Sequence, residues 1–235
     1  MDNYRQRKQR GYIENNELLA YKEKPIEELT ALFSSDNAVE RTVAARLLQL
    51  NCDTANILLH ALVNEPALYT RLAITEKLES GDSKTAQQMI PFLAVIGKNQ
   101  HRTPIAPSKK KSFPLPRDLI ARSLGRMNPT VFQTLLESAT ELPPEKLSEL
   151  IDAIGYMAYY HQSLATTENY QALLQMKDAY RQEPLIQWKL LICFSAFPQS
   201  KELLLMEEQF TAEAQRSLNL LAVRKASRTR SAFEQ

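Results

Sequence analysis

The sequence is poor in the residue types from which catalytic and metal-binding sites are most often built. Its 235 residues include two cysteines, three histidines and five glycines. Two cysteines in unrelated contexts exclude a disulfide framework or a cysteine-rich metal cluster. A glycine-rich phosphate loop, an H-E-x-x-H motif and a G-x-S-x-G motif are all missing. We therefore predict that the protein is not an enzyme and has no catalytic residues, no metal and no cofactor.

Long apolar stretches are missing as well. No apolar run approaches the roughly 18 residues that a membrane-spanning helix needs. The N-terminal segment MDNYRQRKQRGY is charged and is not followed by an apolar stretch, so we do not interpret it as a secretory signal. Alternating runs of β-branched residues, which are typical of strands, are also lacking. We expect a reduced, cytoplasmic, all-α protein without stable membrane insertion.

A short sequence pattern recurs along the chain, and we take one apolar residue near the end of each copy as its anchor. Its anchor residues are Leu48, Leu78, Leu124 and Ile154, separated by steps of 30, 46 and 30 residues. Four residues before each anchor stands another apolar residue: Ala44, Ile74, Ile120 and Leu150. Such i, i+4 pairs form an apolar stripe on one face of a helix. The fixed period predicts an array of helix pairs, with an insertion in the longer step.

The array is predicted to span residues 25–223. A basic arm and a short capping helix (14–23) occupy residues 1–24, and a basic tail occupies residues 224–235. The first helices of the pairs are expected at 25–34, 54–64, 84–96, 129–140, 169–180 and 201–210. The second helices are expected at 39–48, 68–78, 115–125, 147–155, 185–196 and 212–223.

The pattern resembles that of HEAT-type helical repeats. It has the form V-x-R-x-x-A-A-x-x-L at Val39–Leu48, and a glycine follows the leucine in Arg117–Gly125. The chain is most similar to the short bacterial HEAT repeats that are named after phycobilin lyases. The resemblance implies a right-handed α-α superhelix of about six helix pairs, whose second helices line a concave surface. Most such proteins are binding scaffolds, and the class includes adaptors, DNA glycosylases, lyase subunits and assembly factors.

Charge is unevenly distributed along the chain. Residues 1–10, 98–116 and 222–235 together carry a net charge of +11, whereas the rest of the chain carries −9. An acidic scaffold with basic appendages favours an acidic partner for the appendages and repels polyanions elsewhere.

The insertion at 98–116 is the first candidate binding segment. It contains four prolines and no acidic residue, so we expect an extended, solvated loop between two helices. Its cations are candidates for contact with an acidic protein, a phosphate group or an anionic lipid. These cations are Lys98, Arg102, Lys109, Lys110 and Lys111. The alternative is a flexible insertion whose lysines lie on the acidic scaffold.

The second helices supply the other candidates. Equivalent positions in the repeats alternate in charge: Arg46, Glu76, Arg122 and Asp152. They form either a ligand-binding ridge or a ladder of ion pairs between neighbouring repeats, and we favour the ladder. The candidate residues that line the concave surface are Arg46, Glu76, Arg122, Arg126, Asp152 and Tyr156. Tyr156 belongs to a tyrosine cluster that suits either a binding hot spot or packing, and Asp152 would be a general base only in a desolvated site.

These features predict a non-enzymatic scaffold that binds a protein partner with an acidic surface. The rival hypothesis is a nucleic-acid-binding protein similar to DNA glycosylases, which requires the basic segments to converge on one face. A third hypothesis is attachment of the N-terminal arm to anionic membrane surfaces.

Overall fold

The structure is a computed structural model that describes the backbone of residues 3–233 and the side chains of residues 3–224. Within this range all regular structure is helical, which confirms the all-α prediction. The α-helices, in chain order, are α1 (Asn3–Gln9), α2 (Asn15–Leu18), α3 (Ile26–Ala31), α4 (Ala38–Leu47), α5 (Cys52–Asn64), α6 (Leu68–Glu79), α7 (Ser83–Met89), α8 (Leu119–Arg126), α9 (Phe132–Ser138), α10 (Pro144–Tyr160), α11 (Thr167–Ala179), α12 (Pro184–Phe194), α13 (Lys201–Leu205) and α14 (Thr211–Phe233). Short 3-10 helices extend or join them: η1 (Leu19–Tyr21), η2 (Leu32–Ser34), η3 (Ile90–Phe92), η4 (Pro129–Val131), η5 (Ala139–Glu141), η6 (Gln162–Leu164) and η7 (Pro198–Ser200).

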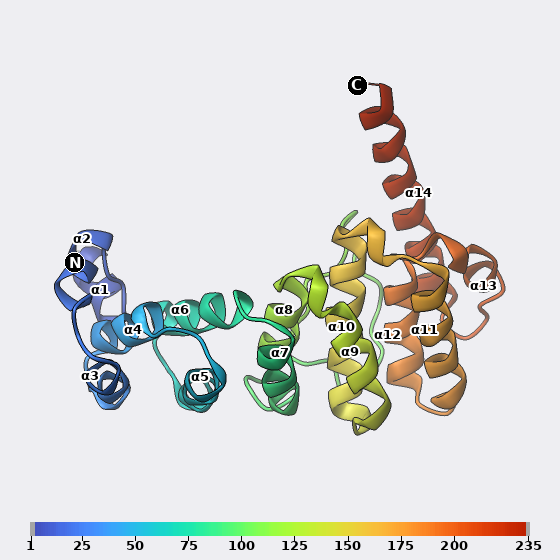
Figure 1. The fold of residues 1–235 in the computed structure, drawn as a ribbon. Helices are drawn as coiled ribbons and strands as arrows, with labels where there is room; N and C mark the ends of the chain where they lie inside the picture. Colours follow the sequence, from blue (N-terminus) through green and yellow to red (C-terminus); the bar gives the residue numbers. More distant parts are fainter. Residues whose placement is uncertain (1–2, 234–235) are drawn as a thin grey trace.

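The helices pair in sequence and pack in rows. In one row α4, α6, α8, α10, α12 and α14 each contact the next helix, and α5, α7 and α9 do the same in a second row. Partners also pack across the rows, as α9 does on α10 and α11 on α12. The molecule is elongated, with α1 at one end and α14 at the other (Figure 1). The six pairs from α3/α4 to α13/α14 correspond to the six predicted from the repeats.

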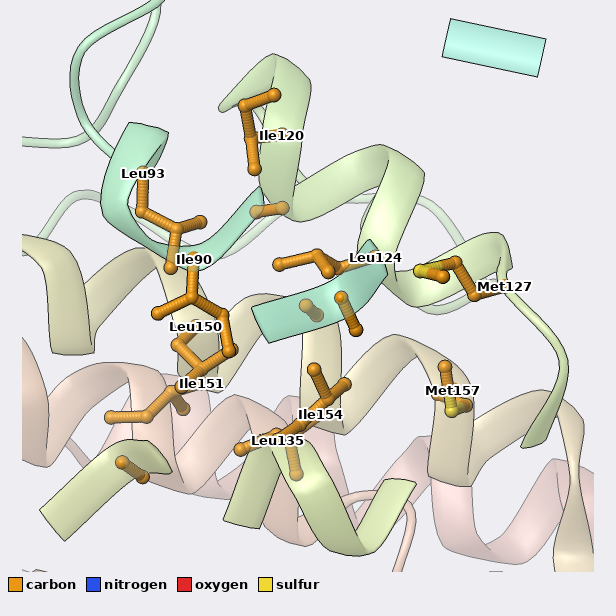
Figure 2. Close-up of a cluster of buried hydrophobic side chains, with 14 of the residues drawn as sticks. Ile90, Leu93, Ile120, Leu124, Met127, Leu135, Leu150, Ile151, Ile154 and Met157 are labelled. Carbon is orange, nitrogen blue, oxygen red and sulfur yellow. The ribbon is translucent and has the colours of Figure 1, made fainter. Parts of the chain in front are cut away.

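The apolar stripe of the repeated pattern forms the core of these pairs. All eight stripe residues, from Ala44 to Ile154, have no exposed surface. Figure 2 shows the part of this core between α8 and α10, where Ile154 lies beside Leu135 of α9 and Leu124 of α8 belongs to the same cluster. Complete burial of one such side chain stabilises a fold by about 1.5–3 kcal/mol. The period of the sequence is therefore maintained by packing between successive helices.

Two predicted boundaries in the third pair are wrong. The helix expected over 84–96 ends with a 3-10 turn at Phe92, and Ala94 then reverses the chain with a φ of 62°. The helix expected from residue 115 begins only at Leu119, after the N-cap residue Asp118. The segment without helix is consequently longer at both ends than residues 98–116.

The last helix is longer than the repeats predict. They predict a helix over 212–223 followed by a basic tail, but α14 continues to Phe233. Arg224, the first cation of the predicted tail, is 8% exposed and donates a 2.9 Å hydrogen bond to the carbonyl oxygen of Ala158. The side chains of the remaining tail cations lie outside the described residues.

The N-terminal segment is docked rather than free. Residues 3–9 form α1, which packs on α4. The Cζ atom of Arg7 lies 3.6 Å from the centroid of the Tyr12 ring, and Lys8 forms an ion pair with Glu17 of α2. The described part of the predicted basic arm is therefore packed on the first repeats.

The insertion is extended as predicted, but only part of it is solvated. Phe113 is 4% exposed and packs with side chains of α10 and α12. Arg216 of α14 donates hydrogen bonds of 2.9 and 3.1 Å to the carbonyl oxygens of Ser108 and Ser112. Lys109–Lys111, between these two attachment points, are exposed. The insertion is therefore attached to helices far along the chain, and its lysines occupy the solvated part.

None of the helices in residues 3–233 is both long and apolar enough to span a bilayer. These residues also contain no group of three or more His, Cys, Asp or Glu side chains placed to hold a metal ion.

Candidate functional site

A basic groove lies where α6, the start of α8 and the N-terminal segment meet. Its volume is about 440 Å³. Leu68 and Leu72 of α6 line it and are 40% and 45% exposed. No acidic side chain is present among its lining residues, all of which are described. Four arginines line it as well: Arg10, Arg71, Arg117 and Arg122.

Backbone contacts bring Arg10 to the basic groove. Its carbonyl oxygen accepts a 2.9 Å hydrogen bond from the backbone nitrogen of Tyr69 at the start of α6. The next residue, Gly11, has a φ of 87°, and a Cβ atom there would lie 2.6 Å from Oγ1 of Thr70. Only glycine permits both this backbone conformation and this close approach. The crossing of the N-terminal segment over α4 and α6 thus depends on Gly11.

Asp118 positions the two arginines at the start of α8. Its side chain is fully buried. Its Oδ1 atom caps α8. Its Oδ2 atom accepts hydrogen bonds from the backbone nitrogen of Ala94 at 3.2 Å and from Nε2 of Gln100 at 2.8 Å. Arg117 directly precedes this cap, and Nε of Arg122 donates to a backbone carbonyl of the insertion at 3.1 Å. One buried carboxylate therefore fixes both ends of the insertion beside the basic groove.

An arginine stands seven residues before the anchor residue in each of the first three repeats, at Arg41, Arg71 and Arg117, and its environment differs among them. Arg41 donates hydrogen bonds of 2.8 and 2.9 Å to the two carboxylate oxygens of Glu65, which is 5% exposed. Its equivalents Arg71 and Arg117 line the basic groove, and no ion pair in the described part of the chain involves either of them or Arg10. The charge of Arg41 is thus used within the fold, whereas three groove arginines can meet an anionic ligand.

The structure does not gather the predicted cationic residues at one place. Arg122 lines the basic groove, and Lys98 is exposed between two residues that line it. Arg102 lines a different cavity, and Lys109–Lys111 lie between the attachments to α14. Arg126 is exposed, and its Nη1 atom lies 3.8 Å from Oε1 of Glu79.

The other two predicted residues belong to the packing of the C-terminal pairs. Tyr156 is half-buried, with its ring centroid 6.2 Å from that of Phe113 and 4.7 Å from that of Tyr160. Asp152 forms an ion pair with Lys189 at 3.0 Å. Neither residue lines the basic groove.

The predicted ladder of ion pairs between neighbouring repeats is wrong. Among the described residues, no ion pair joins any two of Arg46, Glu76, Arg122 and Asp152. Arg122 bonds a backbone carbonyl instead, and Asp152 bonds a lysine of α12. The alternating charges in equivalent positions therefore do not set the register of the helices.

Sequence reasoning missed a buried charge cluster between α10 and α12. Nζ of Lys189 donates hydrogen bonds to Oε1 of Glu149 at 2.7 Å and to Oδ2 of Asp152 at 3.0 Å. Lys189 is 0% exposed and Glu149 1%. Burial raises the pKa of Glu149 to about 7, against the opposing effect of the lysine. The available signal was a single lysine within the apolar segment Leu185–Ala196, because a buried lysine requires a charged partner.

Comparison with other proteins assigns no family to the chain. It matches no family model, no curated protein and no solved structure.

Proposed function

We propose that the protein is a HEAT-like scaffold, a right-handed α-α superhelix without enzymatic activity, whose basic groove binds an acidic segment of a partner protein. The unbroken row of contacts from α4 to α14 supports the superhelix, since solenoids are built from units that pack on their neighbours. The basic groove lies on α6 and α8, which belong to this row. In HEAT-like proteins the second helices line the concave binding surface.

Three arginines of the basic groove, Arg10, Arg71 and Arg117, carry this proposal, because Nε of Arg122 is already bonded to a backbone carbonyl. A guanidinium group binds a carboxylate through two parallel hydrogen bonds, and a groove without acidic side chains leaves these donors to the ligand. The exposed Leu68 and Leu72 provide apolar contact beside the arginines. A segment that alternates acidic and apolar residues satisfies both requirements.

Two observations favour a protein partner over nucleic acid. No aromatic side chain is present among the described residues that line the groove, although base stacking is a main contribution to single-strand binding. The N-terminal segment and α14 lie at opposite ends of the molecule (Figure 1), so these two basic segments do not converge at one place. The acidic remainder of the chain would also repel a long polyanion.

The lysines of the insertion have a secondary role in this proposal. Lys109–Lys111 are exposed and lie outside the basic groove. Exposed charges at the margin of an interface mainly raise the association rate of an oppositely charged partner. Reversal of these three charges should therefore slow association of an acidic partner and leave its dissociation rate nearly unchanged.

Fluorescence anisotropy with a labelled peptide of alternating glutamate and leucine tests the groove directly. We expect saturable binding that weakens as salt is raised, because exposed charges are screened. The double variant Arg71→Glu, Arg117→Glu should weaken binding by about tenfold or more, which corresponds to about 1.4 kcal/mol. Arg181→Glu is the matched control, because Arg181 is exposed and lies outside the groove.

A charge-reversed peptide of lysine and leucine should not bind. The proposal fails if the acidic peptide does not bind the wild-type protein or binds the double variant equally well. It also fails if single-stranded or duplex nucleic acid binds more tightly than the peptide and loses this binding in the same double variant. That result would identify the groove as a phosphate site.

A further inference from the structure

A second cavity, separate from the basic groove, lies between the insertion and the N-terminal ends of α10 and α12. Its volume is about 380 Å³, which is within the range of small-molecule sites. Residues 100–104 of the insertion form one wall, and four residues of α10 (Pro144, Glu145, Ser148 and Glu149) and residues 183–186 form the others. We call it the acidic cavity, because Glu145, Glu149 and Glu183 line it against a single lining cation, Arg102.

Three of the residues that line the acidic cavity have buried polar atoms without partners. Glu149 is 1% exposed, and its Oε1 atom accepts a hydrogen bond from Lys189, but its Oε2 atom has no partner within the described structure. Gln100 donates through Nε2 to Asp118, and its Oε1 atom is likewise unpartnered. Buried acceptors of this kind are costly unless a ligand or ordered water satisfies them.

His101, which is next to Gln100 on the insertion, is the third of these side chains. Both of its ring nitrogens are buried without a hydrogen-bond partner in the described part of the chain. Its ring lies edge-on to Trp188, with the centroids 5.0 Å apart. Burial lowers the pKa of His101, so the ring is neutral and offers one acceptor and one donor.

The charges around the acidic cavity favour a cation over an anion. Lys189, behind the wall, is already bound by Glu149 and Asp152, so that cluster carries one net negative charge when Glu149 is ionised. The helix N-termini at the cavity are weak anion sites, because Pro144 and Pro184 occupy the first helical positions and lack an N–H group. The cavity therefore combines excess negative charge with unpaired acceptors.

We propose that the acidic cavity binds a primary ammonium group, carried either by a free polyamine or by the side chain of a lysine in a partner chain. An ammonium group has three N–H donors and no acceptor. Glu149, Gln100 and His101 provide the complementary acceptors, and Glu145 and Glu183 at the exposed margin attract the cation. This site is independent of the acidic-peptide groove, and each can fail without the other.

Binding should depend on pH in a defined direction. The pKa of Glu149 is raised to about 7 by burial, and the charged groups near it are Lys189 of α12, Asp152 of α10 and Asp118 before α8. A bound ammonium group favours the ionised carboxylate, so affinity should increase as pH rises through about 7. His101, on the insertion, is neutral in this range and does not oppose the trend.

Isothermal titration calorimetry on the full chain tests the site. The probes are putrescine, spermidine and Nα-acetyl-lysine methylamide, and the controls are tetramethylammonium, which has the charge but no N–H donor, and succinate. We expect at least one primary amine to bind, both controls to fail, and the affinity to be higher above neutral pH than below it. Tighter binding of the polyamines identifies a free amine as the ligand, and tighter binding of the lysine derivative identifies a partner side chain.

Two variants locate the binding. Glu149→Gln removes the buried carboxylate. Thr103→Trp closes the mouth of the cavity, because Thr103 lines the cavity from an exposed position of the insertion. This second variant preserves the fold even if the first is unstable. Each should weaken amine binding by about tenfold or more. Glu141→Gln, an exposed acid outside the cavity, should have no effect. Absence of binding by every primary amine, or full binding by Thr103→Trp, would overturn the proposal.

Discussion

Nε2 of Gln100 donates a 2.8 Å hydrogen bond to Oδ2 of Asp118, and this bond joins the two candidate sites of the molecule. Gln100 lines the acidic cavity, whereas Asp118 lies between Arg117 and Leu119, which line the basic groove. The same carboxylate also caps α8 and holds the backbone of Ala94. One buried side chain therefore determines the geometry of both sites.

Asp118→Ala should be more damaging than the loss of an ordinary helix cap. The variant loses the cap, leaves the backbone nitrogen of Ala94 unpartnered, and reduces the bonds of the Gln100 amide to the one with the carbonyl oxygen of Ile96, so we expect the free energy of unfolding to fall by about 3–5 kcal/mol. Asp82→Ala is the control, since Asp82 caps α7 through Thr85 but is itself exposed; it should cost about 1 kcal/mol. Urea unfolding of both variants makes the comparison, and equal losses would show that the contacts to the insertion contribute nothing.

Gly11→Ala should destabilise the docked N-terminal segment. Gly11 and Gly97 have the same φ of 87°, but a Cβ atom at Gly11 meets Thr70 and Thr42, whereas one at Gly97 meets nothing within 4 Å. Gly97→Ala should therefore cost only the backbone strain, about 1–2 kcal/mol, and Gly11→Ala should cost a further 1–3 kcal/mol or so. Thermal unfolding measures both, and a smaller loss in Gly11→Ala than in Gly97→Ala would contradict the packing of this segment.

Glu149 should make stability depend on pH. Its pKa is raised from 4.5 to about 7, so between these values the folded protein binds more protons than the unfolded chain. The free energy of unfolding must then fall as pH rises. Relative to Glu149→Gln, the wild type should lose up to about 3 kcal/mol across this interval. Denaturant unfolding of both proteins at several pH values tests this expectation, and parallel curves would show that Glu149 does not titrate there.

Phe113→Ala should release the insertion. Phe113 is buried between α10 and α12, and it follows the exposed Lys109–Lys111 closely in sequence. Loss of this anchor should expose the lysines to proteases more often. We expect trypsin to cleave Phe113→Ala at these lysines several times faster than the wild type. Leu115→Ala is the control, because Leu115 is 44% exposed, and an equal rate in both variants would show that Phe113 is not the anchor.

The helix pairs were predictable because a single physical signal defines them. Leu124 and Ile154 recur with apolar residues four positions earlier, and burial of that face allows little variation in spacing. The ends of the insertion were less predictable. The start of α8 depends on the contacts of Asp118 with Ala94 and Gln100, and such tertiary contacts leave no periodic trace in the sequence.

The candidate sites were harder to predict than the fold. Arg122 was identified from its position in the repeats. Arg10 and Arg71 line the basic groove together with Arg122 only because the N-terminal segment folds back over α6. Glu149 and Lys189 are 40 residues apart and meet only because α10 packs on α12. The predicted charge ladder is wrong for a related reason, since Arg122 and Asp152 bond to other groups and Glu76 is exposed.

The attachment of the insertion to Arg216 affects how the molecule unfolds. In an array of nearest-neighbour units, the terminal helices fray one at a time. Here Ser108 and Ser112 are bonded to a residue more than 100 positions later, so α14 cannot detach without also freeing the middle of the chain. The insertion and the last helix should therefore open together, as one cooperative unit with a shared rate of amide hydrogen exchange.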